Sequence, residues 1–410
     1  MVVMGYDLND DISQVSFCGA EGEIPSTLPV TAGTEKYVIP TVLAKKNGVN
    51  QWIFGEDAVT LAKDGGGVLV DSLLTKAKEG RIVTVEDQEY SALSLLELFL
   101  KRTLALVNLV VPWQLADFIV FTVEELNAEA VGVLSQVIKE LPVADEKVRF
   151  QSHVESFFAY MIHQPPELWQ NQVLILEDRE DSLRTYRFSV NRKTKPMVVR
   201  IEGKNYPPVT DRDDKKFLES AHDLMKNQAV SSVYLIGDGF DGGWDRETLR
   251  FLCMGRRVFQ GKNLYTKGAC YSALDYSRPG ELQENYLFLG NDKLKCNIGM
   301  NVIKDGRESY FPLADAGVNW YDIHGEYEFL LGRERELRLR LTPIMGKDVR
   351  WAVIRLLGFP DRPERAGRIK MKISMESENS LLLSIEDLGF GELYPSRGAC
   401  IHEKIELFEE

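Results

Sequence analysis

The sequence lacks the short motifs by which several large enzyme classes are recognised. Its 410 residues contain no GxSxG, no GxxxxGK[ST] and no HExxH. The five histidines, at positions 153, 163, 222, 324 and 402, do not follow a metal-ligand spacing. The sequence therefore gives no indication of a serine hydrolase, a P-loop NTPase or a zinc protease.

Paired cysteines and targeting segments are also missing. The chain has five cysteines, none at a CxxC spacing: Cys18, Cys253, Cys270, Cys296 and Cys400. An odd, scattered set argues against a zinc ribbon or a disulfide framework and is typical of a reducing cytosol. The opening MVVMGYDLND has no basic stretch followed by an apolar run, so no signal peptide is predicted. We therefore expect a cytoplasmic protein.

A long uninterrupted apolar segment is absent. The most apolar stretch, SALSLLELFLKRTLALVNLVVPW, contains Glu97, Lys101 and Arg102. Charges inside such a stretch predict a buried amphipathic helix and no membrane span.

An excess of basic residues is absent as well. The chain has 49 Lys and Arg against 62 Asp and Glu, which gives a formal net charge of −13. A chain with this balance has no general attraction for a phosphate backbone, so a nucleic-acid partner is not expected.

What the sequence does contain is the composition of a globular protein, with 44% hydrophobic and 27% charged residues. A chain of 410 residues exceeds what one hydrophobic core usually supports, so more than one domain is expected. Residues 1–280 alternate strand-like and helix-like segments, which predicts a layered α/β domain. No internal repeat is visible.

The pattern changes in residues 281–410, where apolar residues recur at every second position. Such alternation, with turn residues at short intervals, predicts a β-rich, sandwich-like domain. Trp351 is predicted to belong to its core. The alternating apolar positions are Leu294, Cys296, Ile298, Met300 and Val302; Leu337, Leu339 and Leu341; Ile369, Met371, Ile373 and Met375; and Leu381, Leu383 and Ile385.

Two hairpin patterns and a later glycine turn occur in a characteristic order. The first hairpin begins with MGYDL, the second is VLILEDREDSLRTYRFSV, and the glycine turn VYLIGDGF is followed by NLYTKGACYSAL. This order resembles the actin, sugar-kinase and heat-shock-chaperone ATPase superfamily. The segment IPTVLAKKNGVNQWIFGEDA is similar to the seventy-kilodalton heat-shock chaperones in particular. The resemblance implies a shortened actin-like ATPase-type α/β domain over residues 1–280, followed by a β domain over residues 281–410 that resembles the substrate-binding β domain of the chaperones.

The resemblance also implies a nucleotide site. Its residues would come from the first hairpin, the glycine turn and the helix that follows: Asp7, Asn9, Gly237, Asp238, Gly239 and Gly268. Gly237 and Gly239 would allow the backbone to approach an adenosine-type ligand closely.

Both hairpin turns depart from the family pattern, which places glycine and hydroxyl residues beside phosphate. The first turn is Asn9-Asp10-Asp11, and the second, from Glu177 to Ser182, has no glycine. The second is predicted to be a solvent-exposed tip, whereas a positive φ at Asn9 would preserve the shape of the first. A pair of like charges about 4 Å apart costs roughly 4 kcal/mol at an effective dielectric near 20, so carboxylates in these turns would repel a triphosphate.

We therefore expect a degenerate member of the superfamily that acts as a non-catalytic, chaperone-like module and binds a protein or peptide. No cofactor would be required, and weak binding of ATP or ADP with Mg²⁺ is left open. One alternative is a divergent metal-dependent ATPase, in which a divalent ion shields the carboxylates and is held by Asp7, Asp10, Asp11 and Glu177. A second alternative is an actin-like, filament-forming protein. The sequence leaves the oligomeric state open.

Overall fold

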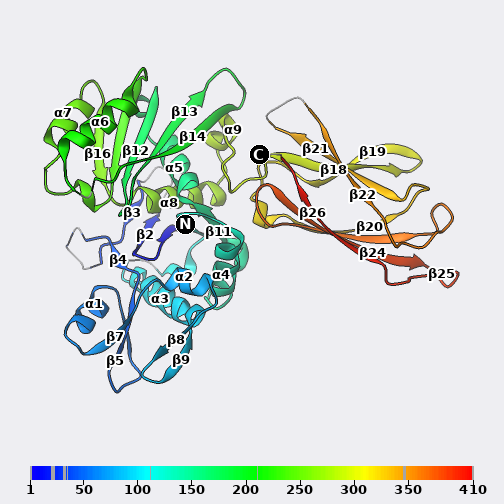
Figure 1. Ribbon diagram of the computed structural model, residues 1–410, viewed down its shortest axis with the longest axis horizontal. Helices are drawn as coiled ribbons and strands as arrows, with labels where there is room; N and C mark the ends of the chain where they lie inside the picture. Colours follow the sequence, from blue (N-terminus) through cyan, green and yellow to red (C-terminus); the bar gives the residue numbers. More distant parts are fainter. Residues whose placement is uncertain are drawn as a thin grey trace. The chain divides into compact units, whose positions relative to one another are not determined.

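The computed structural model describes residues 2–19, 24–30, 34, 36–110, 112–209, 211–344 and 348–408 (Figure 1). The chain forms two compact units, Met1–Phe288 and Leu289–Glu410, which we call unit 1 and unit 2. Unit 1 combines helices with two six-stranded sheets, and unit 2 is built mainly from strands. The coarse prediction of an α/β part followed by a β-rich part is confirmed.

The first sheet of unit 1 contains β1 (Val3–Leu8), β2 (Ile12–Cys18), β3 (Ser26–Thr27), β4 (Ile39–Pro40), β10 (Phe118–Val123) and β11 (Val148–Ser152). β1 pairs antiparallel with β2 and parallel with β10, and β10 pairs parallel with β11. The strand order is β11-β10-β1-β2-β3, with β4 beside β2. The first predicted hairpin is therefore confirmed as β1 and β2.

The second sheet contains β12 (Gln172–Asp178), β13 (Leu183–Asn191), β14 (Met197–Tyr206), β15 (Val230–Ile236), β16 (Arg257–Gly261) and β17 (Tyr286–Phe288). β12 pairs antiparallel with β13 and parallel with β15, and β15 pairs parallel with β16. The order β16-β15-β12-β13-β14 matches the first sheet strand for strand, and β17 continues it beyond β14. The second predicted hairpin is therefore confirmed as β12 and β13. The two halves of unit 1 have the same strand topology, although the sequence shows no internal repeat.

Two long helices connect the halves (Figure 1). α5 (His153–Ile162) follows β11, and α8 (Leu264–Ser277) follows β16. Phe157 of α5 lies in the buried cluster of the second sheet, whereas Ala269 of α8 lies in the cluster of the first. Each of these two helices thus packs on the sheet of the other half.

Side-chain caps mark the beginning of several helices. Asn127 accepts the N–H of Ala130 at 2.9 Å at the start of α4 (Ala128–Lys139), and Ser152 accepts the N–H of Glu155 at the start of α5. Such caps satisfy N–H groups that have no partner inside the helix. The cap on Ser152 fixes the point where β11 turns into α5, which is where His153 enters the cleft described below.

The remaining elements of unit 1 surround the two sheets. An insertion between β4 and β10 carries a three-stranded sheet, a hairpin and three helices, and the second half carries three helices of its own. The elements are β5 (Leu43–Lys46), β6 (Trp52–Phe54), α1 (Gly55–Lys63), β7 (Gly67–Val70), α2 (Leu73–Lys78), β8 (Ile82–Val85), β9 (Gln88–Ser91), α3 (Ala92–Val107), α6 (Asp214–Met225), α7 (Arg246–Leu252) and α9 (Glu281–Asn285).

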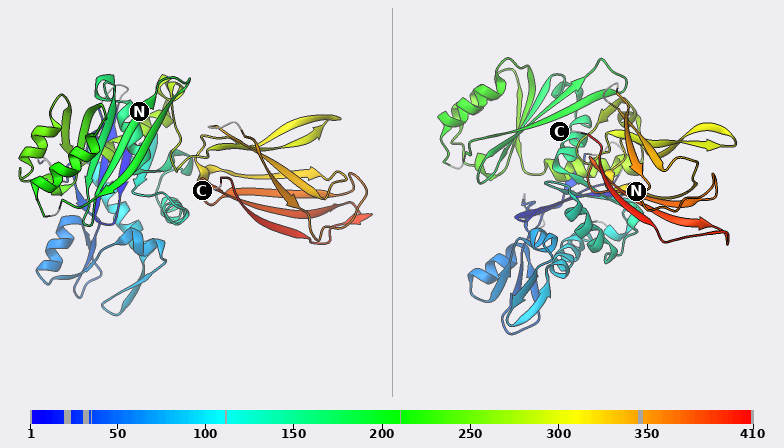
Figure 2. Two further views of the ribbon diagram at one scale, coloured as in Figure 1. Left: turned by 45° about the horizontal axis from the view of Figure 1, so that its top comes forward. Right: turned by 45° about the vertical axis from the view of Figure 1, so that its right-hand side comes forward.

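Unit 2 contains two antiparallel sheets that face each other (Figure 2). The first has the order β19-β18-β21-β22, with β18 (Cys296–Lys304), β19 (Arg307–Ala314), β21 (Glu336–Pro343) and β22 (Arg350–Arg355). The second has β20 (His324–Leu330), β23 (Arg368–Met375), β24 (Ser380–Phe390), β25 (Tyr394–Pro395) and β26 (Cys400–Glu406), with both β25 and β26 paired to β24.

The predicted alternation in unit 2 is confirmed at most positions. The inward-facing residues of both sheets are buried, including Ile298 and Leu339 from the first sheet and Ile373 and Leu383 from the second. The prediction for Trp351 is wrong, because 49% of this residue is exposed. Trp351 pairs with Arg340, whose neighbours Leu339 and Leu341 face inward, so Trp351 lies on the outer face of its sheet.

No helix within the described residues is both long and apolar enough to cross a membrane. The stretch predicted to be a buried amphipathic helix forms α3, and one side of α3 is buried.

Candidate functional site

The candidate site is a polar cavity in unit 1, where the turns of the two hairpins meet the glycine turn. Its volume is about 250 Å³. Four of the residues predicted to bind nucleotide line it, namely Asp7, Asn9, Gly237 and Asp238. The other lining residues used below are Asp11, His153, Glu177, Asp178, Arg179, Lys262 and Tyr265.

The first hairpin turn is held by a side chain. The carboxamide oxygen of Asn9 accepts the N–H groups of Asp11 at 3.0 Å and Ile12 at 2.8 Å. The backbone of Asn9 does not adopt the positive φ that we predicted. The turn keeps its shape through an Asx-type hydrogen bond, and its N–H groups point at Asn9 and away from any ligand.

Asp10 does not join the other predicted metal ligands. Its carboxylate accepts the N–H groups of Leu74 and Thr75 at 2.9 and 3.0 Å, and the hydroxyl of Thr75 at 2.5 Å. Asp10 thereby caps α2 and lines a neighbouring hollow together with Leu74 and Thr75. The other three predicted ligands, Asp7, Asp11 and Glu177, do line the cavity. In the part of the chain that the structure describes, no group of three or more His, Cys, Asp or Glu side chains is arranged to hold a metal ion.

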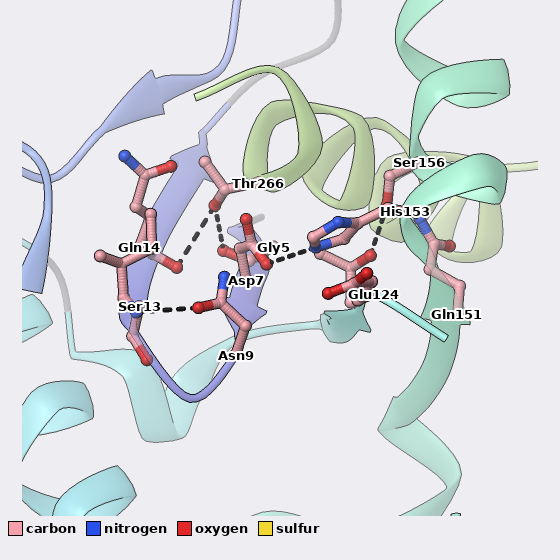
Figure 3. Close-up of polar contacts among 12 residues, drawn as sticks. Gly5, Asp7, Asn9, Ser13, Gln14, Glu124, Gln151, His153, Ser156 and Thr266 are labelled. Atoms are coloured by element: carbon pink, nitrogen blue, oxygen red, sulfur yellow. Dashed lines mark hydrogen bonds and ion pairs between the residues drawn. The ribbon is translucent and has the colours of Figure 1, made fainter. Parts of the chain in front are cut away.

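Asp7 forms a buried ion pair with a histidine that the sequence analysis did not select. The carboxylate of Asp7 lies 2.8 Å from Nε2 of His153, and both side chains are almost fully buried (Figure 3). The imidazole stacks on the ring of Tyr265 at 3.9 Å. Burial lowers the pKa of His153, but the charge of Asp7 and its hydrogen bond outweigh this effect and raise the pKa above its ordinary value. Asp7 is thus paired with a side chain of the protein.

The second hairpin turn brings an arginine into the cavity. Arg179 lies 3.1 Å from Glu177 and 3.1 Å from Glu124, and Glu124 also pairs with Arg184. Only Glu180 and Asp181, at the end of the turn, are exposed. The prediction of a solvent-exposed tip is therefore wrong for Glu177, which is 6% exposed.

The charges of this network perturb one another. Burial raises the pKa of Glu177 even though Arg179 and His153 lower it. Burial also acts to raise the pKa of Glu124, but Arg179 and Arg184 together hold it below its usual range. The two arginines therefore favour the ionised form of Glu124, whereas burial of Glu177 is only partly offset by the charges of Arg179 and His153.

The glycine turn is also filled by a carboxylate. Gly237 has a φ of 113°, which glycine adopts without strain. The N–H of Gly239 donates to Asp178 at 2.9 Å, and a Cβ on Gly239 would lie 2.3 Å from that carboxylate. Asp238 pairs with Lys262. The group that lies close to the backbone of Gly239 is thus the carboxylate of Asp178, and the predicted approach to an adenosine-type ligand stays a prediction.

Gly268 has a structural task away from the cavity. A Cβ at this position would lie 2.0 Å from the carbonyl oxygen of Ser156. Gly268 therefore lets α8 cross α5 at short distance, and it does not line the cavity.

Several buried polar atoms of the residues that line the cavity have no hydrogen-bond partner among the described residues. They are Nδ1 of His153, Oε2 of Glu177, Oδ1 of Asp178, Nε of Arg179 and Oη of Tyr265. Buried polar atoms normally find a partner, so the cavity is suited to water or to a small ligand with both donors and acceptors.

The sequence analysis missed three residues that organise the site, namely His153, Glu124 and Tyr265. His153 directly follows β11 and begins α5, a position at the end of a strand where functional side chains often lie. That position was the available signal. Glu124 and Tyr265 offered none, because their roles depend on contacts between segments far apart in the sequence.

The architecture and the cavity define a two-unit protein with a duplicated α/β unit that carries an acidic polar cleft, and a β-sandwich unit. Comparison with protein families agrees with this division. Residues 24–291 match a family described as "Family of unknown function (DUF5716) C-terminal", and residues 293–407 match "Domain of unknown function (DUF8552)". The first match covers more than half of the chain, and the chain belongs to the DUF5716 family. No curated protein matches the chain.

Proposed function

We propose that the protein is a pseudo-ATPase: a cytoplasmic, non-catalytic interaction module built on an actin-like, chaperone-type fold. The observation that carries the proposal is that charged side chains of the protein itself line the place where phosphates would lie. Arg179 pairs with Glu177, and Asp178 accepts the N–H of Gly239. No ATP, ADP or Mg²⁺ is required in this role.

The topology of unit 1 supports the choice of fold. Each half begins with an antiparallel hairpin, continues with two parallel strands on the same side of the first strand, and ends in a helix. The two hairpin turns and the glycine turn line one cavity, as the resemblance to the actin and chaperone superfamily implies. The short second half is consistent with the shortened form of that fold.

The charges at the cavity support the loss of phosphate chemistry. Six acidic side chains line the cavity against three basic ones, His153, Arg179 and Lys262; the acidic residues are Asp7, Asp11, Glu177, Asp178, Glu180 and Asp238. A single carboxylate about 4 Å from a phosphate oxygen opposes binding by roughly 4 kcal/mol at an effective dielectric near 20. This repulsion rivals the free energy of millimolar binding, about 4 kcal/mol.

The size of the cavity also supports the loss of triphosphate binding. Its volume of about 250 Å³ lies below the 300–1,000 Å³ that is usual for small-molecule sites. The residues present therefore fit a triphosphate poorly. The polar atoms without partners are better matched to ordered water or to a weakly held, uncharged adenosine-type ligand.

One observation favours the alternative of a divergent, metal-dependent ATPase. Asp7, Asp11 and Glu177 line the same cavity, and one oxygen of Glu177 is buried without a partner among the described residues. A divalent cation between them would reverse the sign of the interaction with phosphate. Asp10 would take no part in it, because its carboxylate caps α2.

Isothermal titration calorimetry with ATP, in the presence and absence of Mg²⁺, tests the proposal. We expect no saturable heat at micromolar nucleotide under either condition. Micromolar binding that requires Mg²⁺ and disappears in Asp7→Ala would establish the alternative instead. Asp57→Ala, which changes an exposed carboxylate on α1 outside the cavity, is the matched control.

A further inference from the structure

The outer face of the β19-β18-β21-β22 sheet carries a group of exposed aromatic and apolar side chains. Trp351 and Val353 of β22 are 49% and 50% exposed, and Tyr310 of β19 is 41% exposed. Strand pairing places Trp351 beside Arg340 and Val353 beside Arg338 on the same face. Tryptophan, tyrosine and arginine are the residues most enriched where proteins bind one another strongly.

Contacts between neighbouring strands of the sheet hold the side chains of this outer face in place. The ring of Tyr310 lies over Gly299, where a Cβ would meet the ring at 2.4 Å. The guanidinium of Arg340 lies 5.8 Å from the centre of the same ring, and its Nε is buried without a hydrogen-bond partner among the described residues. The glycine makes room for the ring, and the ring holds Arg340 beside Trp351.

The sheet ends at β22. β22 pairs with β21 on one side, and no other described strand pairs with it. The last strand of a sheet presents backbone N–H and C=O groups that are able to pair with another extended chain. Trp351, Val353 and Arg355 alternate along this edge, so they define three successive contact positions on one face.

The charge around this edge differs in sign from the rest of the chain. The outer face of β21 and β22 carries Arg338, Arg340 and Arg355 against one carboxylate, Glu336, which lies opposite Arg355 and pairs with Arg338 at 2.6 Å, whereas the whole chain has a net charge of −13. Arg355 makes no ion pair with any described carboxylate. A positive edge beside apolar side chains is complementary to a segment that combines carboxylates with apolar residues.

We propose that the outer face and open edge of β22 bind an extended acidic peptide, which adds to the sheet as a strand next to β22. Apolar residues of the peptide lie opposite Trp351 and Val353, and an acidic residue lies opposite Arg355. The inference rests on the interaction role proposed above, because it names the chemical class of the partner. It concerns unit 2 only. It therefore does not depend on whether the cavity in unit 1 binds a nucleotide.

Fluorescence anisotropy with the full chain tests this inference. The probe is a fluorescein-labelled peptide with the repeating order Glu-Ser-Leu-Ser-Leu-Ser, which places Glu, Leu and Leu in succession on one face, compared with the same peptide carrying Lys in place of Glu. We expect saturable binding of the Glu peptide only. Affinity should fall by about tenfold or more in both Trp351→Ala and Arg355→Glu. Arg307→Glu makes the same change of charge at an exposed position in β19 and should bind as the unchanged chain does.

A second measurement tests the added strand. Bound peptide should slow hydrogen exchange of β22 amides and leave those of β20 unchanged, and circular dichroism of the variants establishes that they are folded. The inference is overturned if the Glu peptide does not bind, if the Lys peptide binds equally, or if neither variant weakens binding. It is also overturned if a labelled oligothymidine competes for the same face more tightly than the peptide, because arginine and aromatic side chains also hold single-stranded nucleic acid. Tight ATP binding with intact peptide binding would refute the pseudo-ATPase proposal alone.

Discussion

At the level of a single residue, Asp178 supports the proposed pseudo-ATPase. Its carboxylate accepts the N–H of Gly239, which is the kind of group that a phosphate oxygen would otherwise use. The pKa of Asp178 is raised, because burial outweighs the hydrogen bond from Gly239. Under the proposed function, the N–H of Gly239 is therefore held by a carboxylate of the protein where a nucleotide would otherwise bind.

The Asp7–His153 pair gives a residue-scale prediction for pH dependence. The pKa of His153 is higher in the folded chain than its ordinary value of about 6.5, so the pair stabilises the fold fully below that pH. This stabilisation is lost as the pH rises through the folded pKa. In Asp7→Asn, burial and the charge of Arg179 lower the pKa of His153 against the charge of Glu177 alone, so the trend should reverse. Urea unfolding at a series of pH values measures both trends.

The loss of stability that follows from removing Asp7 can also be predicted. Removing one partner of a buried ion pair typically costs about 3–5 kcal/mol, so Asp7→Ala should reduce the free energy of unfolding by an amount of that order at pH 6. Asp57→Ala serves as the control. If Asp7→Ala unfolds at the same urea concentration as the unchanged chain at every pH, the ion pair is not an important part of the fold.

Gly268 and Gly132 form a matched pair for a second residue-scale prediction. Gly268→Ala should reduce the free energy of unfolding by about 1–3 kcal/mol, because the new methyl group would overlap the carbonyl of Ser156. Gly132→Ala, within α4, meets no atom within 4 Å and should increase it by roughly 0.5–1 kcal/mol. Equilibrium urea denaturation distinguishes the two signs. Equal effects would contradict the close crossing of α5 and α8.

At the scale of elements, Asp10 joins the first hairpin to α2. Its carboxylate accepts two N–H groups at the start of that helix. Asp10→Ala should cost about 1 kcal/mol and speed hydrogen exchange at Leu74 and Thr75. Asp10→Asn should recover part of the loss, because an amide oxygen also accepts these N–H groups. Unchanged exchange rates in Asp10→Ala would refute the capping role and return Asp10 to the set of candidate metal ligands.

The elements also show where sequence analysis succeeds. Both hairpins of unit 1 and the alternating strands of unit 2 were predictable, because alternation and helical spacing are set by residues close together in the chain. Trp351 was placed in the core because apolar character alone does not say which face of a strand is buried. Its pairing with Arg340 decides the face, and that pairing is a contact between strands.

The candidate site was less predictable than the fold. The turns that carry Asn9 and Gly237 could be located, since local order marked them. The sequence did not show that Arg179 would pair with Glu124, or Asp7 with His153, because these partners lie 55 and 146 positions apart and meet only through the duplicated fold. The sequence showed that both turns are acidic. It did not show which basic side chains would pair with their carboxylates.

At the scale of the whole molecule, the division at Phe288 predicts two independent folding units. Fragments 1–288 and 289–410 should each unfold cooperatively in urea, and fragment 289–410 should give the circular dichroism of a β protein. A fragment without a cooperative transition would contradict the division. The match of two separate family descriptions to residues 24–291 and 293–407 agrees with it.

A filament-forming role makes a different prediction for the whole molecule. An actin-like filament would sediment faster as the concentration of protein with ATP and Mg²⁺ is raised, whereas an interaction module without nucleotide chemistry should sediment identically with and without nucleotide. Analytical ultracentrifugation decides between them, and a nucleotide-dependent increase in sedimentation would favour the filament.

The central claim is that charged side chains of the protein occupy the place of a bound polyphosphate. A crystal structure of the full chain, obtained after soaking with ATP and Mg²⁺, tests it most directly. We predict that Arg179 stays paired with Glu177, that Asp178 stays on the N–H of Gly239, and that no triphosphate density appears between the two hairpins. Ordered triphosphate density with a bound cation there, and Arg179 displaced from Glu177, would contradict the account.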